Sequence, residues 1–402
     1  MQKTLWVISL LFLVLWLYSA LKPRVLPPEA YRYFSEDVLS RSLDRATRSY
    51  VCTGLSTLAT FSALYLISRR SATGSILSEL IGGRPTPCRA ALLGLCLGAG
   101  AALLFSLVGL PFNIYLFHLD RAFNLTPMTL VAYLWDYAKN TLLSIGEYSL
   151  AGAAIAWTVT RFPGGWHFIL GGAFLVASLT MYALYPVLVA PMFNSFHPLP
   201  EGQVMQDVRD LAASAGMEVN QVLVMEASAK TSRANAYFAG IGRTKQVVLY
   251  DTLLNSHSRE EIRLVVAHEL AHWRFGHIVK GILASSLGVL AALYAFRLAG
   301  AGADAGTSTS SMVAVERFLV AMFVFATLAG FVLSPVSSYV SRRFEVEADA
   351  YSLSLTGDSA AFVGSQVSLA TTNLADVSLP SFIRWFAATH PSTLERILSA
   401  NP

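Results

Sequence analysis

The chain has 402 residues, of which 54% are hydrophobic and only 13% are charged, and its formal net charge is +4. Because soluble proteins carry about 25% charged residues, a compact body of this composition is expected to be dissolved in a lipid bilayer rather than in water. No basic run with interleaved aromatic residues is present, so nucleic acid is not expected as a partner. Cys52, Cys88 and Cys96 form no CxxC pair, which argues against a disulfide framework or a thiolate metal site.

Seven stretches of the chain are predicted to cross the membrane, because each approaches or exceeds the roughly 20 mostly apolar residues that a spanning helix needs. The first is interpreted as a retained anchor, since the bulky Tyr18 stands where a signal-peptide cleavage site requires a small residue. Pro335 in the seventh predicts a kink. The stretches are 4–21, 51–68, 91–117, 142–160, 166–193, 278–298 and 318–340.

Two polar blocks lie between and after these stretches, at 194–277 and 341–402. Two crossings separate the blocks, so both are expected on the same membrane face, together with the loop 22–49. That face is richer in Lys and Arg, which predicts that it is cytoplasmic. The predicted division is therefore helices one to five with their loops at 1–193, a first polar block at 194–277, helices six and seven at 278–340, and a C-terminal block at 341–402.

The first polar block is predicted to be a small mixed α/β domain. The β-branched runs Gln221–Met225 and Gln246–Tyr250 indicate strands, and Asn235–Phe238 indicates a third. Ser258 and Glu261 form a capping box, which opens a helix that runs towards Gly276.

This capped helix contains the sequence His268-Glu269-Leu270-Ala271-His272. Histidines four residues apart lie on one helical face, so both imidazoles can converge on one ion, and Glu269 can reach a water bound to it. Zinc suits such a site because it accepts nitrogen and oxygen ligands in a tetrahedron and keeps one position open. Chance would produce this motif roughly 0.01 times in a chain of this size. One zinc ion per chain is therefore expected, with a buried structural pair as the alternative.

A second motif, at the start of the C-terminal block, supplies a third ligand. Glu345 and Asp349 are again four residues apart, and Glu345 is predicted to complete a His₂Glu set. Asp349 is predicted to accept a hydrogen bond from the far nitrogen of a ligand histidine. The alternative for this motif is a solvated acidic helix start, and Glu347 is interpreted in that way. His277 lies on the opposite helical face from His268, so it is predicted to pack or hydrogen-bond rather than bind metal.

These motifs together resemble those of the type I CAAX prenyl endopeptidases, which are membrane-spanning zinc peptidases. The resemblance runs in order from Tyr185 to Ile397 and is weaker in the first 150 residues. The further matching segments are Tyr185-Pro186, Ala190-Pro191-Met192-Phe193-Asn194, Pro198-Leu199-Pro200-Glu201-Gly202, Asn235-Ala236-Tyr237-Phe238, Val248-Leu249-Tyr250-Asp251-Thr252-Leu253-Leu254 and Thr389-His390-Pro391-Ser392 with Glu395-Arg396.

The resemblance implies an α-helical integral membrane protein, with seven helices enclosing a water-filled chamber and a gluzincin-type zinc peptidase domain at its cytoplasmic end. It implies that Asn235 and Ala236 hold the substrate backbone, and that His390 and Arg396 assist at the oxyanion or at the ligand glutamate. The chain lacks the tail insertions and ER-retrieval ending of eukaryotic members. A prokaryotic plasma membrane is therefore expected.

The sequence thus predicts a membrane-embedded zinc endopeptidase in which Glu269 acts as general base and then as general acid. Its expected substrates are extended peptide segments near the membrane or at C-termini, with prenylated CAAX segments as one class. A general quality-control protease for membrane proteins is an alternative. A metal transporter is disfavoured because the predicted ligands lie at helix ends, whereas transport sites lie near the bilayer midplane. A zinc-bound scaffold is disfavoured by the intact Glu269.

Overall fold

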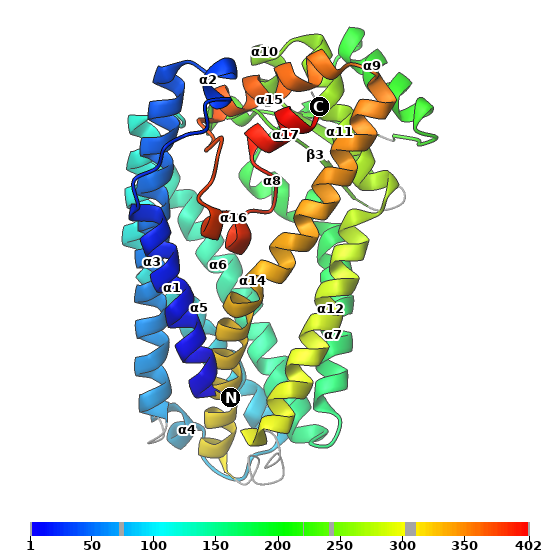
Figure 1. The fold of residues 1–402 in the computed structure, drawn as a ribbon. Coiled ribbons are helices and arrows are strands. Elements are labelled where there is room, and N and C mark those ends of the chain that lie inside the picture. Colours follow the sequence, from blue (N-terminus) through cyan, green and yellow to red (C-terminus); the bar gives the residue numbers. More distant parts are fainter. Residues whose placement is uncertain (1, 72–75, 220, 241–244, 302–310, 401–402) are drawn as a thin grey trace.

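The computed structural model describes residues 2–71, 76–219, 221–240, 245–301 and 311–400. Long helices run along the molecule, and a small sheet with most of the short helices gathers at one end (Figure 1). The N-terminus lies near the opposite end, and the C-terminus lies beside the sheet.

Within the described residues, seven helical segments are long and apolar enough to cross a membrane, and each contains one predicted stretch. This confirms the predicted seven-helix membrane fold. The segments are α1 (Gln2–Leu21), α3 (Glu36–Ser71), α5 (Pro87–Ala122), α6 (Leu130–Arg161), α7 (Trp166–Leu184) continued by a π turn (Tyr185–Val189) and α8 (Ala190–Phe193), α12 (His277–Phe296) followed by a π turn (Arg297–Ala301), and α14 (Met312–Thr356).

Several of these helices are longer than the apolar stretches that predicted them. The 45 residues of α14 span about 68 Å at 1.5 Å per residue, against a hydrocarbon core about 30 Å thick. The helix contains Pro335 and continues without interruption through residue 340, where a block boundary was predicted. It therefore extends well beyond the apolar core. The division into four blocks stays a prediction.

Glycines allow α5 and α6 to approach each other closely. A Cβ atom on Gly94 would lie 2.1 Å from the carbonyl oxygen of Gly152, and one on Gly98 would lie 2.0 Å from the carbonyl oxygen of Tyr148. Neither distance is sterically possible, so the two backbones can meet here only because side chains are absent.

The four-stranded sheet has the order β1-β2-β4-β3, and β3 forms one edge. β1 is antiparallel to β2, β2 is parallel to β4, and β3 is antiparallel to β4. The predictions for β2 and β4 are confirmed, the third strand begins one residue later than predicted, and β1 was not predicted. The strands are β1 (Phe196–Pro198), β2 (Gln221–Met225), β3 (Ala236–Ala239) and β4 (Gln246–Tyr250).

Two helices, α9 (Gln203–Ser214) and α11 (Arg259–Arg274), pack on this sheet through a shared apolar core that includes Val208, Val247 and Leu270. Buried Asp207 on α9 accepts hydrogen bonds from Arg259 and Arg263, which fix the start of α11. The remaining short elements are α2 (Ala30–Tyr33), α4 (Ile76–Ile81), a 3₁₀ turn (Ala227–Ala229), α10 (Asp251–Ser256), α15 (Ser359–Asn373), α16 (Ser381–Ala387) and α17 (Thr393–Ala400).

The segment after α1 packs against the C-terminal helices. Leu26, Phe34 and Leu39 share a buried cluster with Leu394 and Ile397. The loop 22–49, the sheet block and the C-terminal helices therefore lie at the same end of the molecule, as the count of crossings predicted (Figure 1).

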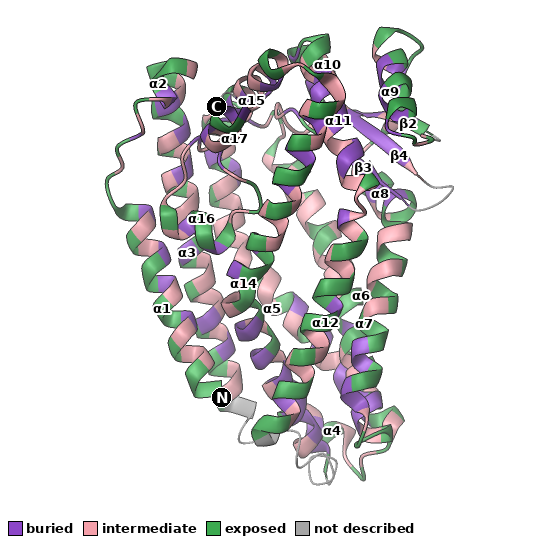
Figure 2. Cartoon of the chain, turned by 45° about the vertical axis from the view of Figure 1, so that its right-hand side comes forward, coloured by how far each residue is buried: buried purple, intermediate pink, exposed green. Residues whose placement is uncertain are grey.

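The long helices carry exposed and half-buried residues on their outward sides, whereas the sheet is largely buried (Figure 2). Large apolar side chains are exposed along them, for example Leu10, Val14, Leu142, Val176 and Leu287. In water such surfaces would be unfavourable, at about 25 cal/mol per Å² of apolar area. This surface is suited to lipid.

Single cysteines in an otherwise cysteine-free chain test this topology. Ser256→Cys and Ser399→Cys should react with a membrane-impermeant maleimide in the same vesicle orientation, because both exposed positions lie at the sheet end. Gly164→Cys, in the loop between α6 and α7, should react only in the opposite orientation. Labelling of Ser256→Cys and Ser399→Cys from different sides would contradict the seven-crossing topology.

Candidate active site

The capped helix α11 presents the histidine motif. The Ser258 hydroxyl accepts a hydrogen bond from the Glu261 backbone N–H, and the Glu261 carboxylate accepts one from the Ser258 N–H, which confirms the predicted capping box. The helix ends just before Gly276, whose φ of +64° turns the chain into α12. His268 and His272 therefore lie in the last two turns of α11, on the side that faces α14.

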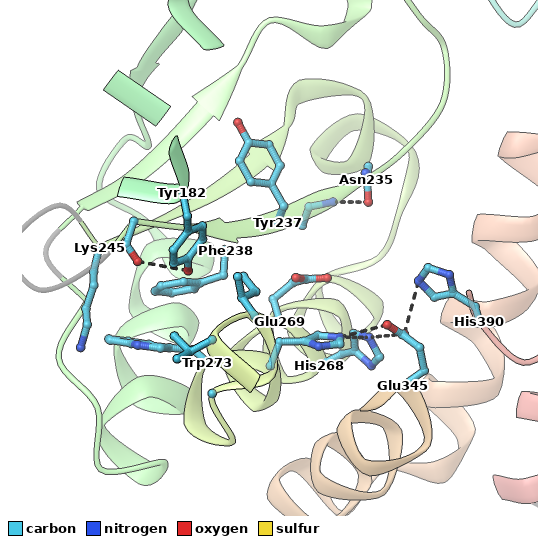
Figure 3. Close-up of a pocket in the computed structure, with 16 residues that line it drawn as sticks. Tyr182, Asn235, Tyr237, Phe238, Lys245, His268, Glu269, Trp273, Glu345 and His390 are labelled. Carbon is cyan, nitrogen blue, oxygen red and sulfur yellow. Dashed lines mark hydrogen bonds and ion pairs between the residues drawn. The ribbon is translucent and has the colours of Figure 1, made fainter. Parts of the chain in front are cut away.

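Three donor atoms converge between α11 and α14 (Figure 3). His268 Nε2 lies 3.1 Å from His272 Nε2 and 3.1 Å from Glu345 Oε2, and His272 Nε2 lies 3.4 Å from Glu345 Oε1. All three side chains offer an atom within 4.8 Å of the others. Two imidazole nitrogens and a carboxylate at this spacing fit one tetrahedral zinc ion with a position left open. Their role as ligands stays a prediction.

Asp349 and Arg396 lie behind His268. Asp349 Oδ1 lies 2.9 Å from His268 Nδ1. The Arg396 guanidinium donates hydrogen bonds of 2.8 and 2.5 Å to the two oxygens of the Asp349 carboxylate. Asp349 is buried, and the Arg396 guanidinium is directed at it. The geometry is the one expected of a carboxylate that fixes the tautomer of a ligand histidine. Arg396 hydrogen-bonds this carboxylate and does not line the pocket.

A pocket of about 450 Å³ opens beside the three donors, and Glu269 lines it. The Phe238 backbone N–H donates a hydrogen bond to the Glu269 carboxylate. Burial raises the pKa of Glu269 to about 7, and nearby Glu345 contributes to this rise. A carboxyl with such a pKa can both accept and return a proton near neutral pH, as a general base that becomes a general acid must do.

The two histidines differ in their affinity for protons. Burial, together with the neighbouring His268, lowers the pKa of His272 to about 4. Burial also lowers the pKa of His268, but its hydrogen bonds to Asp349 and Glu345 outweigh this and raise it to about 9. A metal ion at this position would therefore compete with a proton on His268, and its binding would release that proton.

The edge strand β3 forms a wall of the pocket. The Asn235 carbonyl accepts a hydrogen bond from the Tyr250 backbone N–H, 3.1 Å away, so it faces β4. Because the peptide groups of a strand alternate in direction, those of Ala236 and Phe238 face away from β4, towards the pocket. Asn235 is exposed, and its side-chain oxygen accepts the Ala236 N–H at 2.9 Å.

His390 lies at the rim of the pocket. Its Nε2 is 3.4 Å from Glu345 Oε2, and its side chain is 58% exposed. The structure therefore brings together Asn235, Ala236, Glu269 and His390 around the three converging donors, with Asp349 and Arg396 behind them. The catalytic and substrate-binding roles of these residues stay predictions.

Two residues have contacts that the sequence did not reveal. His277 Nδ1 lies 3.0 Å from His272 Nδ1, and His277 Nε2 lies 2.9 Å from Glu347 Oε2. Glu347, interpreted as a solvated carboxylate, is 46% exposed, and in addition it contacts His277. Its position two residues after Glu345 directs it to another side of α14, where the turn at Gly276 has placed His277. Gly276, a residue type that commonly ends helices, was the sequence signal that His277 does not continue α11.

This fold and site define the class of membrane-embedded metallopeptidases, and comparisons with known proteins agree. Residues 18–195 match the family model described as CAAX prenyl protease N-terminal, five membrane helices, and residues 198–401 match that of peptidase family M48. The chain therefore belongs to peptidase family M48, and it is a metalloendopeptidase with several membrane-crossing helices.

Individual relatives are similar over much of their length. The "CAAX prenyl protease 1 homolog" of Oryza sativa subsp. japonica is 30% identical over 304 residues, covering 74% of this chain and 71% of the relative. The "Uncharacterized metalloprotease YhfN" of Bacillus subtilis is 28% identical, with the same coverages. The crystal structure of S. mikatae Ste24p shares the fold with a TM-score of 0.79 at 22% identity, over 99% of this chain and 98% of that one.

Glu269→Gln tests whether Glu269 is the general base and not a ligand of the zinc ion. The variant should keep about one zinc per chain while kcat falls by about 10²–10⁴-fold, because an amide cannot accept the proton. Glu345→Ala should lose both zinc and activity. Metal analysis and peptide cleavage of the purified proteins measure this, with Glu260→Gln, an exposed glutamate on the same helix, as the control. A Glu269→Gln protein without metal would show that the roles are wrongly assigned.

The pKa of Glu269 predicts an acid limit to activity. A raised carboxyl pKa means that the base form is present above the pKa and is lost as the pH falls through it. A metal cation lowers this pKa, so the limit should lie at or below about pH 7. Below it, kcat/KM should fall about tenfold per pH unit. A pH profile of kcat/KM checks this, and a profile that stays flat down to pH 4 would contradict it.

Proposed function

We propose that this chain is a zinc-dependent endopeptidase in which His268, His272 and Glu345 hold one zinc ion per chain. The observation that carries the proposal is the convergence of these three donors within 4.8 Å of one another, beside a carboxyl group that lines a pocket. When bound, zinc supplies a Lewis acid that polarises the scissile carbonyl and lowers the pKa of water.

Side chains of the protein carry out the proton transfers and orient the reacting groups. Glu269 accepts a proton from the attacking water, whose oxygen forms the new bond to the scissile carbonyl carbon. The C–N bond then breaks, and Glu269 returns the proton to the leaving amine. His390, at the pocket rim near Glu345, is placed to donate a hydrogen bond to the oxygen of the carbonyl under attack. Asp349 holds His268 in the tautomer that leaves its Nε2 free for metal.

The substrate is proposed to bind as an additional strand on β3. The carbonyl oxygens of Ala236 and Phe238 face away from β4 and can accept hydrogen bonds from an extended chain, and the exposed Asn235 side chain lies at the start of that edge. Such contacts recognise backbone rather than side chains. Extended, flexible peptide segments near the membrane are therefore the proposed substrate class.

A CAAX substrate is a narrower candidate within this class. It is favoured by the relatives named as CAAX prenyl protease 1 homologues, which share about 30% identity with this chain. A transporter receives less support, because the converging donors lie on α11 and in the last turns of α14, at the sheet end of the bundle. Metal transit sites are expected near the bilayer midplane.

The sheet end is proposed to face the cytoplasm of a prokaryotic cell, across its plasma membrane. The loop 22–49 carries six Lys and Arg residues and the block 194–277 carries eight, against four in the loop 69–89 at the other end. Positively charged loops are retained on the cytoplasmic side.

Cleavage of one peptide with and without a prenyl group decides between the broad and narrow substrate classes. The broad class predicts kcat/KM values that differ by less than about 100-fold, equivalent to roughly 2.7 kcal/mol, in the same detergent. A larger preference for the prenylated peptide would restrict the function to CAAX processing.

Asn235→Ala tests substrate binding on the β3 edge. The variant should lower kcat/KM by similar factors for unrelated peptides, because the contact is to backbone. Kinetics on three or more unrelated sequences measure this, and Ser256→Ala, an exposed position on α10, is the control. A loss confined to one peptide sequence would instead indicate a side-chain pocket at Asn235.

A further inference from the structure

The second histidine of the motif is connected to a side chain that lies outside the expected ligand set. His272 directs Nε2 towards His268 and Glu345, and its other nitrogen, Nδ1, lies 3.0 Å from His277 Nδ1. His277 Nε2 in turn lies 2.9 Å from Glu347 Oε2. We propose that His277 and Glu347 are positioning residues for His272, and that the relay His272–His277–Glu347 sets the affinity of the site for zinc. This inference rests on the proposed function, because it takes these donors to be zinc ligands.

The valence of the three side chains fixes the direction of every hydrogen bond in the relay. A metal ligand must offer a lone pair, so His272 Nε2 carries no proton and its Nδ1 carries one. That N–H donates to His277 Nδ1, which must then be an acceptor. The proton of neutral His277 therefore lies on Nε2 and is donated to the Glu347 carboxylate. One tautomer of each ring satisfies the whole chain of contacts.

The surroundings of His277 leave its ring little freedom. The residue is 3% exposed. Its ring is stacked on Phe344 at 4.4 Å with an angle of 8° between the planes, and on Phe275 at 5.7 Å with an angle of 27°. His277 is also the first residue of α12, directly after Gly276, whose φ of +64° turns the chain back towards His272. Packing and backbone thus hold the ring where its Nδ1 meets His272.

The two ligand histidines have unequal support. His268 is backed directly by a carboxylate, Asp349, which the Arg396 guanidinium holds on its other side. His272 is backed by a neutral imidazole, and the carboxylate behind that imidazole, Glu347, is 46% exposed. Orientation of the His272 ring should therefore depend mainly on His277, with a smaller contribution from Glu347.

His277→Phe separates this role from packing, because phenylalanine keeps an aromatic ring between Phe275 and Phe344 but cannot accept a hydrogen bond. Loss of such a contact typically lowers metal affinity by about 10–100-fold. We therefore expect His277→Phe to raise the zinc dissociation constant by about 10–100-fold, measured by chelator competition on the full-length holoenzyme in detergent. Glu347→Ala should raise the constant by about 3–10-fold, and Glu347→Gln, which keeps an acceptor, by less than about twofold. Glu260→Ala is the control for removing an exposed glutamate.

The outcomes distinguish the relay from its alternatives. A His277→Phe protein that binds zinc as tightly as the parent would show that His277 only packs. If His277→Phe fails to fold, Glu347→Ala decides, because a half-exposed side chain can be removed without opening the core. Equal affinities of Glu347→Ala and the parent would then overturn the relay. A parent chain that binds no zinc would overturn the proposed function itself.

Discussion

The contact between α11 and one turn of α14 is the constraint on which the site depends. His268 and Glu345 are 77 residues apart in the chain, yet their donor atoms lie 3.1 Å apart. The turn from Glu345 to Asp349 is held from two sides. Glu345 and Asp349 meet His268, whereas Glu347 meets His277 at the start of the next helix. A small rotation of α14 would disturb both sets of contacts together.

The rest of the fold holds these two helices in place. Buried Asp207 fixes the start of α11 against α9 through Arg259 and Arg263, and the apolar core of the sheet block packs against the same helix. Arg396, from the last helix α17, ties the C-terminal segment to Asp349. The geometry of the site is therefore set by charged side chains of α9, α11 and α17 together with Asp349 of the membrane helix α14.

The sequence predicted those parts of the structure that have a local signal. Apolar stretches located the seven membrane segments, the capping box located the start of α11, and the spacing of four residues grouped the candidate ligands. The predicted apolar stretch ended at residue 340, whereas α14 continues through the polar residues 341–356. Strand β1 was missed, since three residues that include Pro198 show no strand pattern.

The contacts of His277 and Glu347 could not be predicted because they depend on two helices from distant parts of the chain. Glu347 follows Glu345 by two residues, and in isolation such a carboxylate is indistinguishable from a solvated one. Residue spacing placed His277 on the face of α11 opposite His268, on the assumption that the helix continues past Gly276. The chain instead turns at Gly276, which brings His277 back towards His272. The orientation of a helix pair is a tertiary property that residue spacing does not record.

Because α14 is one continuous helix, a tilt of its membrane part also moves the part that carries Glu345. The same continuous helix that packs inside the membrane bundle carries Glu345, ten residues beyond Pro335, or about 15 Å along the axis. A tilt of about 5° about that proline would displace Glu345 by about 1.3 Å, several times the roughly 0.2 Å tolerance of a metal–ligand distance. A change in bilayer thickness that tilted α14 would therefore displace Glu345 relative to the other two converging donor side chains.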